Sequence, residues 1–185
     1  IAIAILGVVG WNYYQDQQRQ AAETASSYFQ RLLGNASASE IGANERSLIQ
    51  QDAATLKDEY SDGAYAQYAA LILAKLAVAD NDLETAESEL RWLLINSPES
   101  ELLALTNIRL AQVLQAQGRL SQALDLVQDG DDAWQGRRLE VKGDILLAQG
   151  NSAAAREAYT KAKQVATDQG ANTALLSLKL DNLVE

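Results

Sequence analysis

The chain has 185 residues, of which 48% are apolar, and it contains neither histidine nor cysteine. This much apolar material suffices for a buried core, while the missing residue types exclude imidazole acid–base catalysis, thiol nucleophiles, disulfides and the usual zinc sites. Acidic residues outnumber basic ones by 25 to 15. That balance argues against nucleic acid as a partner, because affinity for nucleic acid depends on lysine and arginine displacing counterions.

The chain begins with an apolar stretch, residues 1–11, that carries no charge and leads into an aromatic cluster of Trp11, Tyr13 and Tyr14. This pattern is typical of the trailing part of a membrane helix that ends in an interfacial aromatic belt. A helix of this length covers about 16 Å of a hydrocarbon core of ~30 Å, so we expect the rest of the span to precede the first residue. We therefore predict that residues 1–14 form the C-terminal part of a membrane anchor.

Basic residues are scarce near this stretch, since Arg19 is the only one before Arg31. Such scarcity favours a translocated position for the domain that follows. Two alternatives stay open for the apolar stretch, namely a helix packed on the core and the tail of a cleaved signal peptide. The run Gly7-Val8-Val9-Gly10-Trp11 matches a signal cleavage site poorly, and this favours the anchor.

Apolar residues at steps of three and four predict two helices before the repeats, over residues 12–33 and 44–60. The segment 35–44, which is rich in alanine, serine and glycine, separates them as a linker. As domains, residues 15–34 are predicted to form a juxtamembrane helix, and residues 35–63 a linker and helix that lead into the repeats.

The remainder, residues 64–185, contains a pattern that recurs three times: a small residue, a turn residue seven positions later, and an alanine five positions after that. The three copies are Ala74–Asn81–Ala86, Ala111–Gly118–Ala123 and Gly143–Gly150–Ala155. Their spacings of 37 and 32 residues bracket the ~34-residue period of tetratricopeptide repeats. Each copy predicts two antiparallel helices whose small residues meet across the pair, joined by a turn with left-handed backbone. The predicted fold class is all-α, a tetratricopeptide-like right-handed helical solenoid with a truncated N-terminal transmembrane helix.

Two acidic runs, Asp80-Asn81-Asp82 and Asp129-Gly130-Asp131-Asp132, present the oxygen ligands that Ca²⁺ prefers. Measured from Asp80, the first run does not fit a calcium loop, which requires glycine where Thr85 stands and a bidentate acid where Arg91 stands. We interpret both runs as helix caps and turns, and Pro98 as the end of the first repeat. We predict no metal site, no cofactor and no catalytic residue.

In a solenoid of this kind the first helix of every repeat lines the concave face, where outward side chains form a surface for protein partners. The outward positions are Tyr68, Leu71, Lys75, Val78, Leu105, Ile108, Gln112, Gln115, Arg137, Glu140, Asp144 and Leu147. The predicted protein-binding residues are Tyr68, Lys75, Gln112 and Arg137. Leu71, Ile108 and Leu147 are interpreted as core, because apolar residues at helical spacing usually face the interior.

Four segments follow one another along the chain: LGVVGWNYY, AAETASSYFQRLL, NIRLAQVLQAQGRLSQAL and GDILLAQGNSAAAREAY. In this order they resemble the YfgM family, ancillary subunits of the bacterial Sec translocon, and the resemblance covers essentially the whole chain. It implies a single-pass inner-membrane protein with a periplasmic tetratricopeptide-like domain. It further implies association with the Sec translocon and with the membrane-anchored periplasmic chaperone PpiD, assistance to exported proteins, and a link to envelope stress signalling.

These features together predict a non-enzymatic adaptor with no small-molecule substrate. Two other functions stay open. One is a self-assembling scaffold in which the long helices from Asn12 onward pair between copies. The other is a carboxylate-only hydrolase, since paired carboxylates carry out glycoside hydrolysis, although no two acids stand in an apolar setting that would separate their pKa values. A deep pocket with two close carboxylates would indicate the hydrolase.

Overall fold

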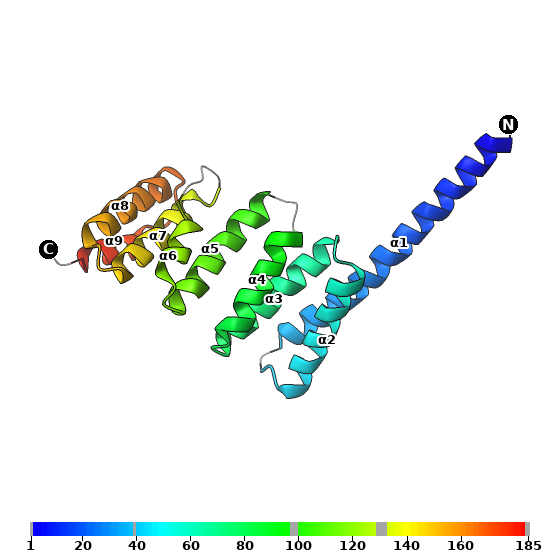
Figure 1. Ribbon diagram of the computed structural model, residues 1–185, viewed down its shortest axis with the longest axis horizontal. Coiled ribbons are helices and arrows are strands. Elements are labelled where there is room, and N and C mark those ends of the chain that lie inside the picture. The colour runs from blue at the N-terminus through cyan, green and yellow to red at the C-terminus, as the bar shows by residue number, and fades with distance from the viewer. Residues whose placement is uncertain (1, 39, 97–99, 129–132, 184–185) are drawn as a thin grey trace. The chain divides into compact units, whose positions relative to one another are not determined.

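The computed structural model describes residues 2–38, 40–96, 100–128 and 133–183, and every regular element within them is an α-helix. The helices are α1 (Ala2–Ala36), α2 (Ala43–Glu59), α3 (Ala64–Ala79), α4 (Leu83–Asn96), α5 (Ser100–Ala116), α6 (Leu120–Asp125), α7 (Gln135–Ala148), α8 (Ser152–Asp168) and α9 (Ala174–Asp181) (Figure 1). This confirms the all-α prediction. Within these ranges no helix combines the length and the apolar character that crossing a membrane requires.

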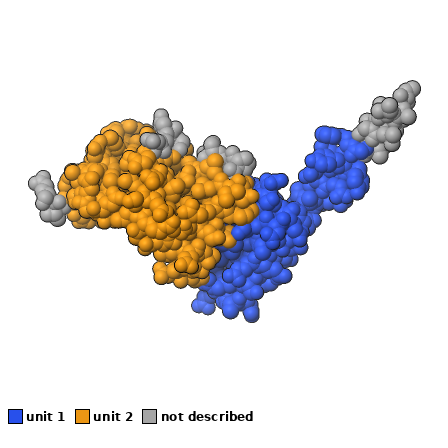
Figure 2. Space-filling model, in the orientation of Figure 1, with its two compact units in different colours: residues 1–76 blue, residues 77–185 orange. Residues whose placement is uncertain are grey.

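The chain divides into two compact units, residues 1–76 and residues 77–185 (Figure 2). The boundary falls inside α3, near its C-terminal end. Ala74 belongs to unit 1 and Ala86 to unit 2, so their contact stays a prediction.

The first helix of unit 1, α1, is continuous over 35 residues, so the predicted anchor segment and the predicted juxtamembrane helix form one helix. Residues 10–20 are all exposed, and this part of α1 extends beyond the rest of the unit (Figure 1). Further along, Leu32 is fully buried and Ala25 is nearly so. Packing therefore holds the C-terminal half of α1, whereas residues 10–20 make no buried contact.

The second helix, α2, provides the other side of that packing and matches its predicted bounds to within one residue at each end. Ile49, Ala53 and Leu56 are fully buried. They lie on one face because their steps of four and three residues follow the helical period. Phe29 of α1 extends this core to the start of α3, with its ring centroid 5.1 Å from that of Tyr65.

Unit 2 contains one type of turn four times. The second residue after the helix has a positive φ in each: Asn81 (58°), Gly118 (77°), Gly150 (81°) and Gly170 (67°). At the second turn the Gly118 N–H donates to the Gln115 carbonyl and the Arg119 N–H donates to the Leu114 carbonyl, both at 2.9 Å, and the other three turns have the equivalent bonds. Such bonds satisfy the last carbonyls of a helix and require the left-handed conformation that glycine and asparagine adopt most readily. The first three turns confirm the predicted positions, whereas the fourth, which precedes α9, was not predicted.

The helices of unit 2 pack in chain order. α4 contacts α5, α5 contacts α6 and α7, α7 contacts α8, and α8 contacts α9, as in a helical repeat array. Ala111 and Ala123, on α5 and α6, are both fully buried. In the third pair the nearest neighbour of Gly143 is Tyr159, and the predicted contact of Gly143 with Ala155 stays a prediction. A Cβ on Gly143 would lie 2.4 Å from the Tyr159 ring, which reaches across from one helical turn beyond the buried Ala155.

Candidate protein-binding surface

Two of the predicted binding residues, Tyr68 and Lys75, lie on α3 in unit 1. They are about two helical turns apart and therefore share one side of the helix. Both are exposed, Tyr68 by 50%, although the Tyr68 ring centroid lies 6.1 Å from that of Phe29. Leu71 between them is buried, which confirms its interpretation as core. This side of α3 presents an aromatic ring and a cation.

The third predicted residue, Gln112, lies on α5 in unit 2 and is partly buried, as is Leu105 two turns earlier. Ile108 points into the core, as expected. Arg109 lies four residues after Leu105 and three before Gln112, a spacing that places all three on one helix face, and it is exposed. The repeat pattern did not predict Arg109 as a surface residue, because the pattern assigns outward positions at fixed places in each repeat and position 109 is not one of them.

The fourth predicted residue, Arg137, lies in the first turn of α7. Its Nη1 donates to Oε2 of Glu140 at 2.7 Å, and its side chain is 44% exposed. Because α5 packs on α7, Gln112 and Arg137 belong to neighbouring helices of one unit. Leu147 of α7 is 42% exposed, so its interpretation as core is wrong. It lies where the chain leaves the helix, and residues 147–150 are all exposed there.

Two further outward positions of α7, Glu140 and Asp144, are occupied by α9. Lys179 Nζ donates to Glu140 Oε1 at 2.8 Å and to the two carboxylate oxygens of Asp144 at 2.6 and 2.8 Å. The Tyr159 hydroxyl of α8 donates to Asp144 Oδ1 at 2.7 Å. The expectation that these two acids face a partner is therefore wrong, because a helix of the same chain covers them. The signal for this helix was the leucine-rich segment after Gly170.

The charges in this cluster balance one another. Burial alone would raise the pKa of Glu140, but hydrogen bonds from Lys179 and Arg137 outweigh that effect and hold the pKa below its ordinary value. Burial and the hydrogen bond to Asp144 raise the pKa of Tyr159, so its hydroxyl stays neutral and donates. The two carboxylates share one lysine, and such a pair does not supply the separate acid and base that glycoside hydrolysis requires.

A pocket of about 630 Å³ lies between the turn at Asn81 and the turn at Gly118. Its lining residues are Asn81, Asp82, Leu83, Glu84, Glu87, Gln117 and Arg119. Gln117 Nε2 donates to the Leu83 carbonyl at 3.1 Å, and Arg119 Nη1 donates to Glu87 Oε2 at 2.6 Å. Burial alone would raise the pKa of Glu87, but hydrogen bonds and the charge of Arg119 lower it overall. These polar groups bind one another and fasten successive helices together.

The acidic run that precedes α4 caps that helix, as interpreted. Asp82 Oδ1 accepts a hydrogen bond from the Thr85 N–H at 3.1 Å. Hydrogen bonding to Thr85, first to its side chain and then to its N–H, lowers the pKa of Asp82. Asn151 caps α8 in the same way. Pro98 and the second acidic run, 129–132, lie outside the described residues. Within the described part of the chain no three carboxylates are grouped so as to hold a metal ion.

Comparison with known proteins connects this architecture to a family. A family model described as a tetratricopeptide repeat-like domain matches residues 1–185. No solved structure matches the chain. A protein of Aggregatibacter actinomycetemcomitans is 31% identical, over 98% of this chain and 85% of its own length. Proteins of Neisseria gonorrhoeae and Escherichia coli K12 are each 30% identical, over 99% and 97% of this chain and 86% and 85% of their own lengths. All three relatives are ancillary SecYEG translocon subunits. The chain therefore has a tetratricopeptide repeat-like domain and belongs to the YfgM family of ancillary SecYEG translocon subunits.

Proposed function

We propose that this protein is a non-enzymatic adaptor of the Sec translocon. In this proposal its N-terminal segment anchors it in the bacterial inner membrane, and its helical domain lies in the periplasm and assists exported proteins. The observation that carries the proposal is the match to ancillary SecYEG subunits over nearly the full length of the chain. A match of this extent includes every helix described above and is not confined to a shared repeat.

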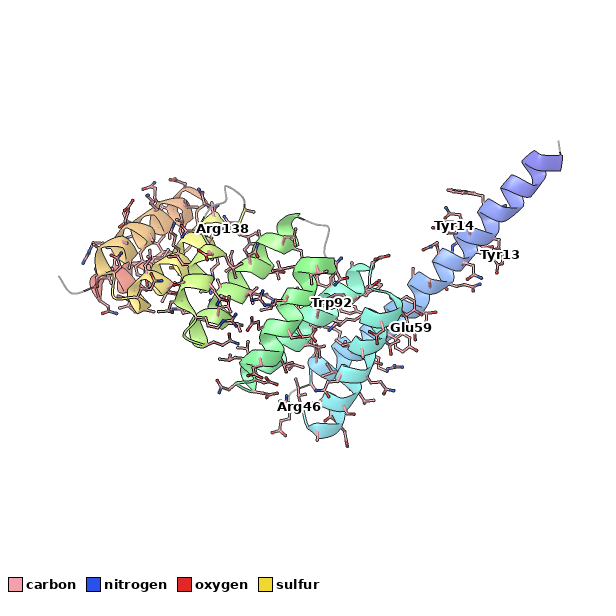
Figure 3. The ribbon with its side chains drawn as sticks, in the orientation of Figure 1. Tyr13, Tyr14, Arg46, Glu59, Trp92 and Arg138 are labelled. Atoms are coloured by element: carbon pink, nitrogen blue, oxygen red, sulfur yellow. The ribbon has the colours of Figure 1, made fainter. Side chains whose placement is uncertain are left out.

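The N-terminal part of α1 supports attachment to a membrane. Residues 1–11 carry no charge, and Trp11, Tyr13 and Tyr14 are each more than half exposed. Tyr13 and Tyr14 lie on the part of α1 that extends beyond the packed helices of unit 1 (Figure 3). Aromatic rings with a polar edge are stabilised at the boundary between lipid and water. We place that boundary at this cluster.

The outward side chains of the repeat helices support an adaptor role. Tyr68 and Lys75 in unit 1, and Gln112 and Arg137 in unit 2, offer aromatic, cationic and amide groups of the kind found at protein interfaces. We propose two partners, the SecYEG complex and the periplasmic chaperone PpiD. Contact with both would bring a chaperone to the site where exported chains emerge.

Copurification tests the translocon association. The full chain, tagged at its C-terminus, is extracted from membranes in mild detergent and captured, and SecY and PpiD are detected by immunoblotting. We expect both in the captured fraction. A variant without residues 1–14 serves as the control and should leave the membrane fraction. Capture of the chain with neither protein would contradict the proposal, and capture only with further copies of itself would support the self-assembling scaffold instead.

Orientation is tested separately. Alkaline phosphatase, which is active only outside the cytoplasm, is fused to the C-terminus of the full chain. We expect activity in intact cells, and the variant without residues 1–14 should lose it. An inactive fusion of the full chain, present at normal level, would refute the periplasmic position while leaving the association with SecYEG intact.

A further inference from the structure

A segment of α1 separates the aromatic cluster from the packed helices of unit 1 (Figure 1). Residues 15–24 are exposed, apart from the partly buried Ala21, and the first buried residue after the cluster is Ala25. Ala25 lies eleven residues after Tyr14. At 1.5 Å per residue the helix covers about 16 Å between them. This segment, the spacer, is defined as residues 15–24.

The spacer has the properties of a stiff rod. It lies inside one helix that is continuous over 35 residues, and it contains neither proline nor glycine, where helices kink most easily. Side chains link successive turns at its N-terminal end. Gln17 Nε2 donates to the Tyr13 hydroxyl at 2.9 Å, and Gln18 Nε2 donates to the Tyr14 hydroxyl at 3.2 Å. A helix without a kink keeps its two ends at a fixed separation.

The end of the packed helices that is nearest to the aromatic cluster is the turn between α2 and α3, residues 60–63. α2 runs antiparallel to α1, because Arg31 pairs with Asp52 whereas Tyr28, earlier in α1, lies beside Tyr60, after the end of α2. The ring centroids of Tyr28 and Tyr60 are 6.5 Å apart. Tyr28 follows Tyr14 by fourteen residues. This corresponds to about 21 Å along the helix.

Two features oppose a tilt of α1 that would bring this turn down to a lipid surface. Trp11 and Tyr13 are two residues apart and therefore lie on opposite sides of the helix. A strong tilt would push one ring into the hydrocarbon and lift the other out of the boundary. The end of α2 and the turn carry three exposed carboxylates, Asp58, Glu59 and Asp62. Anionic headgroups repel these carboxylates.

We propose that the spacer holds the packed helices of unit 1 about 16–21 Å from the membrane boundary and thereby keeps a passage for an exported chain that has not yet folded. This inference rests on the proposed function, which supplies the membrane anchor. An α-helix with its side chains is about 10–12 Å across, and stacked extended strands lie about 10 Å apart, so either form of chain fits beneath the turn. A small folded domain, about 30 Å across, does not fit.

The first test measures the height of the passage. Because the chain contains no cysteine, Ala64→Cys places a single fluorophore at the start of α3, and Asn12→Cys places one at the boundary. The full-length protein is reconstituted in vesicles of phosphatidylethanolamine and phosphatidylglycerol, whose headgroups carry a spin label that quenches at short range. We expect strong quenching at position 12 and almost none at position 64.

A shortened spacer provides the comparison. Removal of residues 15–21 shortens α1 by about 10 Å and rotates the packed helices by only about 20°. It leaves the net charge unchanged, because Asp16 and Arg19 are lost together. The label at position 64 should then be quenched much more strongly. Exchange of residues 15–21 for glycine and serine keeps the chain length without the stiffness, and should give intermediate quenching. Equal quenching of the position-64 label in the parent and the shortened variant would overturn the spacer.

The second test identifies the occupant. A photo-activated cross-linker replaces either Gln20, on the spacer, or Asn44, in the first turn of α2 and hence at the far end of the packed helices. An exported chain is arrested part-way through SecYEG in the same vesicles. We expect cross-links to the arrested chain from position 20 and few from position 44. Cross-links from position 44 without any from position 20 would overturn the passage.

The outcomes separate the two proposals. A protein that copurifies with SecYEG, but whose label at position 64 lies at the lipid surface, overturns the spacer and leaves the adaptor function standing. A protein that stays outside the membrane fraction overturns the anchor and the spacer together.

Discussion

The ring of Tyr159 fills the space that a side chain on Gly143 would need. A Cβ on Gly143 would lie 2.4 Å from Cε1 and 2.5 Å from Cδ1 of the tyrosine. The ring cannot easily move away, because it is 1% exposed and its hydroxyl is bound to Asp144. The close approach of α7 to α8 therefore depends on the absence of a single methyl group.

Gly143→Ala should accordingly lower the free energy of unfolding, by about 1–3 kcal/mol, because the added carbon overpacks a filled core. Urea melts followed by circular dichroism measure the change. Gly34→Ala in α1 is the matched control. No atom lies within 4 Å of a Cβ at that position, and alanine stabilises a helix relative to glycine by about 0.5–1 kcal/mol. Equal stability of Gly143→Ala and the parent would refute the steric argument.

Replacement of Gly118 should also lower the free energy of unfolding, but for a different physical reason. Its φ is 77° and nothing lies within 4 Å of a Cβ there. Gly118→Ala should thus destabilise by about 1–2 kcal/mol through backbone strain alone. Gly118→Asn should cost less, since Asn81 adopts a φ of 58° in the equivalent turn. The expected order of stability in urea melts is glycine, then asparagine, then alanine. Alanine as stable as asparagine would contradict the assignment of the turn.

Lys179 connects α9 to the acids of α7, and its loss should weaken that connection. Lys179→Met keeps the length of the side chain and leaves Glu140 and Asp144 without their shared cation. We expect a loss of about 1–3 kcal/mol at neutral pH, the usual cost of an unpaired, partly buried polar group. Lys161→Met provides the comparison, because its ion pair with Glu157 is solvent-exposed and contributes little.

The same variant should change how stability depends on pH. The pKa of Glu140 in the folded protein lies below its ordinary value of 4.5. Its carboxylate therefore stabilises the fold above that ordinary value, and the contribution is lost as the pH falls through the folded-state pKa. In Lys179→Met the Glu140 carboxylate contributes less stabilisation. The free energy of unfolding should therefore fall less steeply than that of the parent as the pH is lowered from roughly 6 to 3. Parallel pH profiles of parent and variant would show that the lysine does not set this pKa.

Tyr68 is expected to contribute to partner binding more than to folding. Tyr68→Ala should weaken binding to SecYEG by about tenfold or more if the ring is buried at the interface. Its effect on the melting temperature should be small, since the Tyr68 ring is half exposed and its centroid lies 6.1 Å from that of Phe29. Tyr68→Phe keeps the ring, so its affinity for SecYEG should lie between those of the parent and of Tyr68→Ala. Unchanged binding by Tyr68→Ala would place the interface elsewhere.

Features that depend on local chemistry could be predicted from the sequence. The turns at Asn81, Gly118 and Gly150 follow from residue types that tolerate a positive φ. The bounds of α2 follow from apolar residues that recur with the helical period. Gly170 supports the same turn but falls outside the threefold pattern, and α9 was missed with it.

Features that depend on which surfaces meet could not be predicted in this way. Ile108 and Leu147 occupy comparable apolar positions, yet one is buried in the middle of α5 and the other is exposed at the end of α7. Lys179 contacts acids that lie 35 and 39 residues earlier, and no local pattern indicates this choice. The tertiary arrangement decides such pairings.

The distances along the chain between bonded groups bear on how unit 2 folds. Gln117 bonds to a carbonyl 34 residues earlier, and Lys179 reaches a carboxylate 39 residues earlier. The entropy lost on closing a loop grows with its length, and chains with short-range contacts fold fastest. Each helix pair can therefore pack on the preceding pair as soon as its own residues are present, because its bonds connect groups within about one repeat length. A chain that emerges gradually from a channel can fold such a unit helix by helix. No long segment then stays unfolded until a distant part of the chain appears.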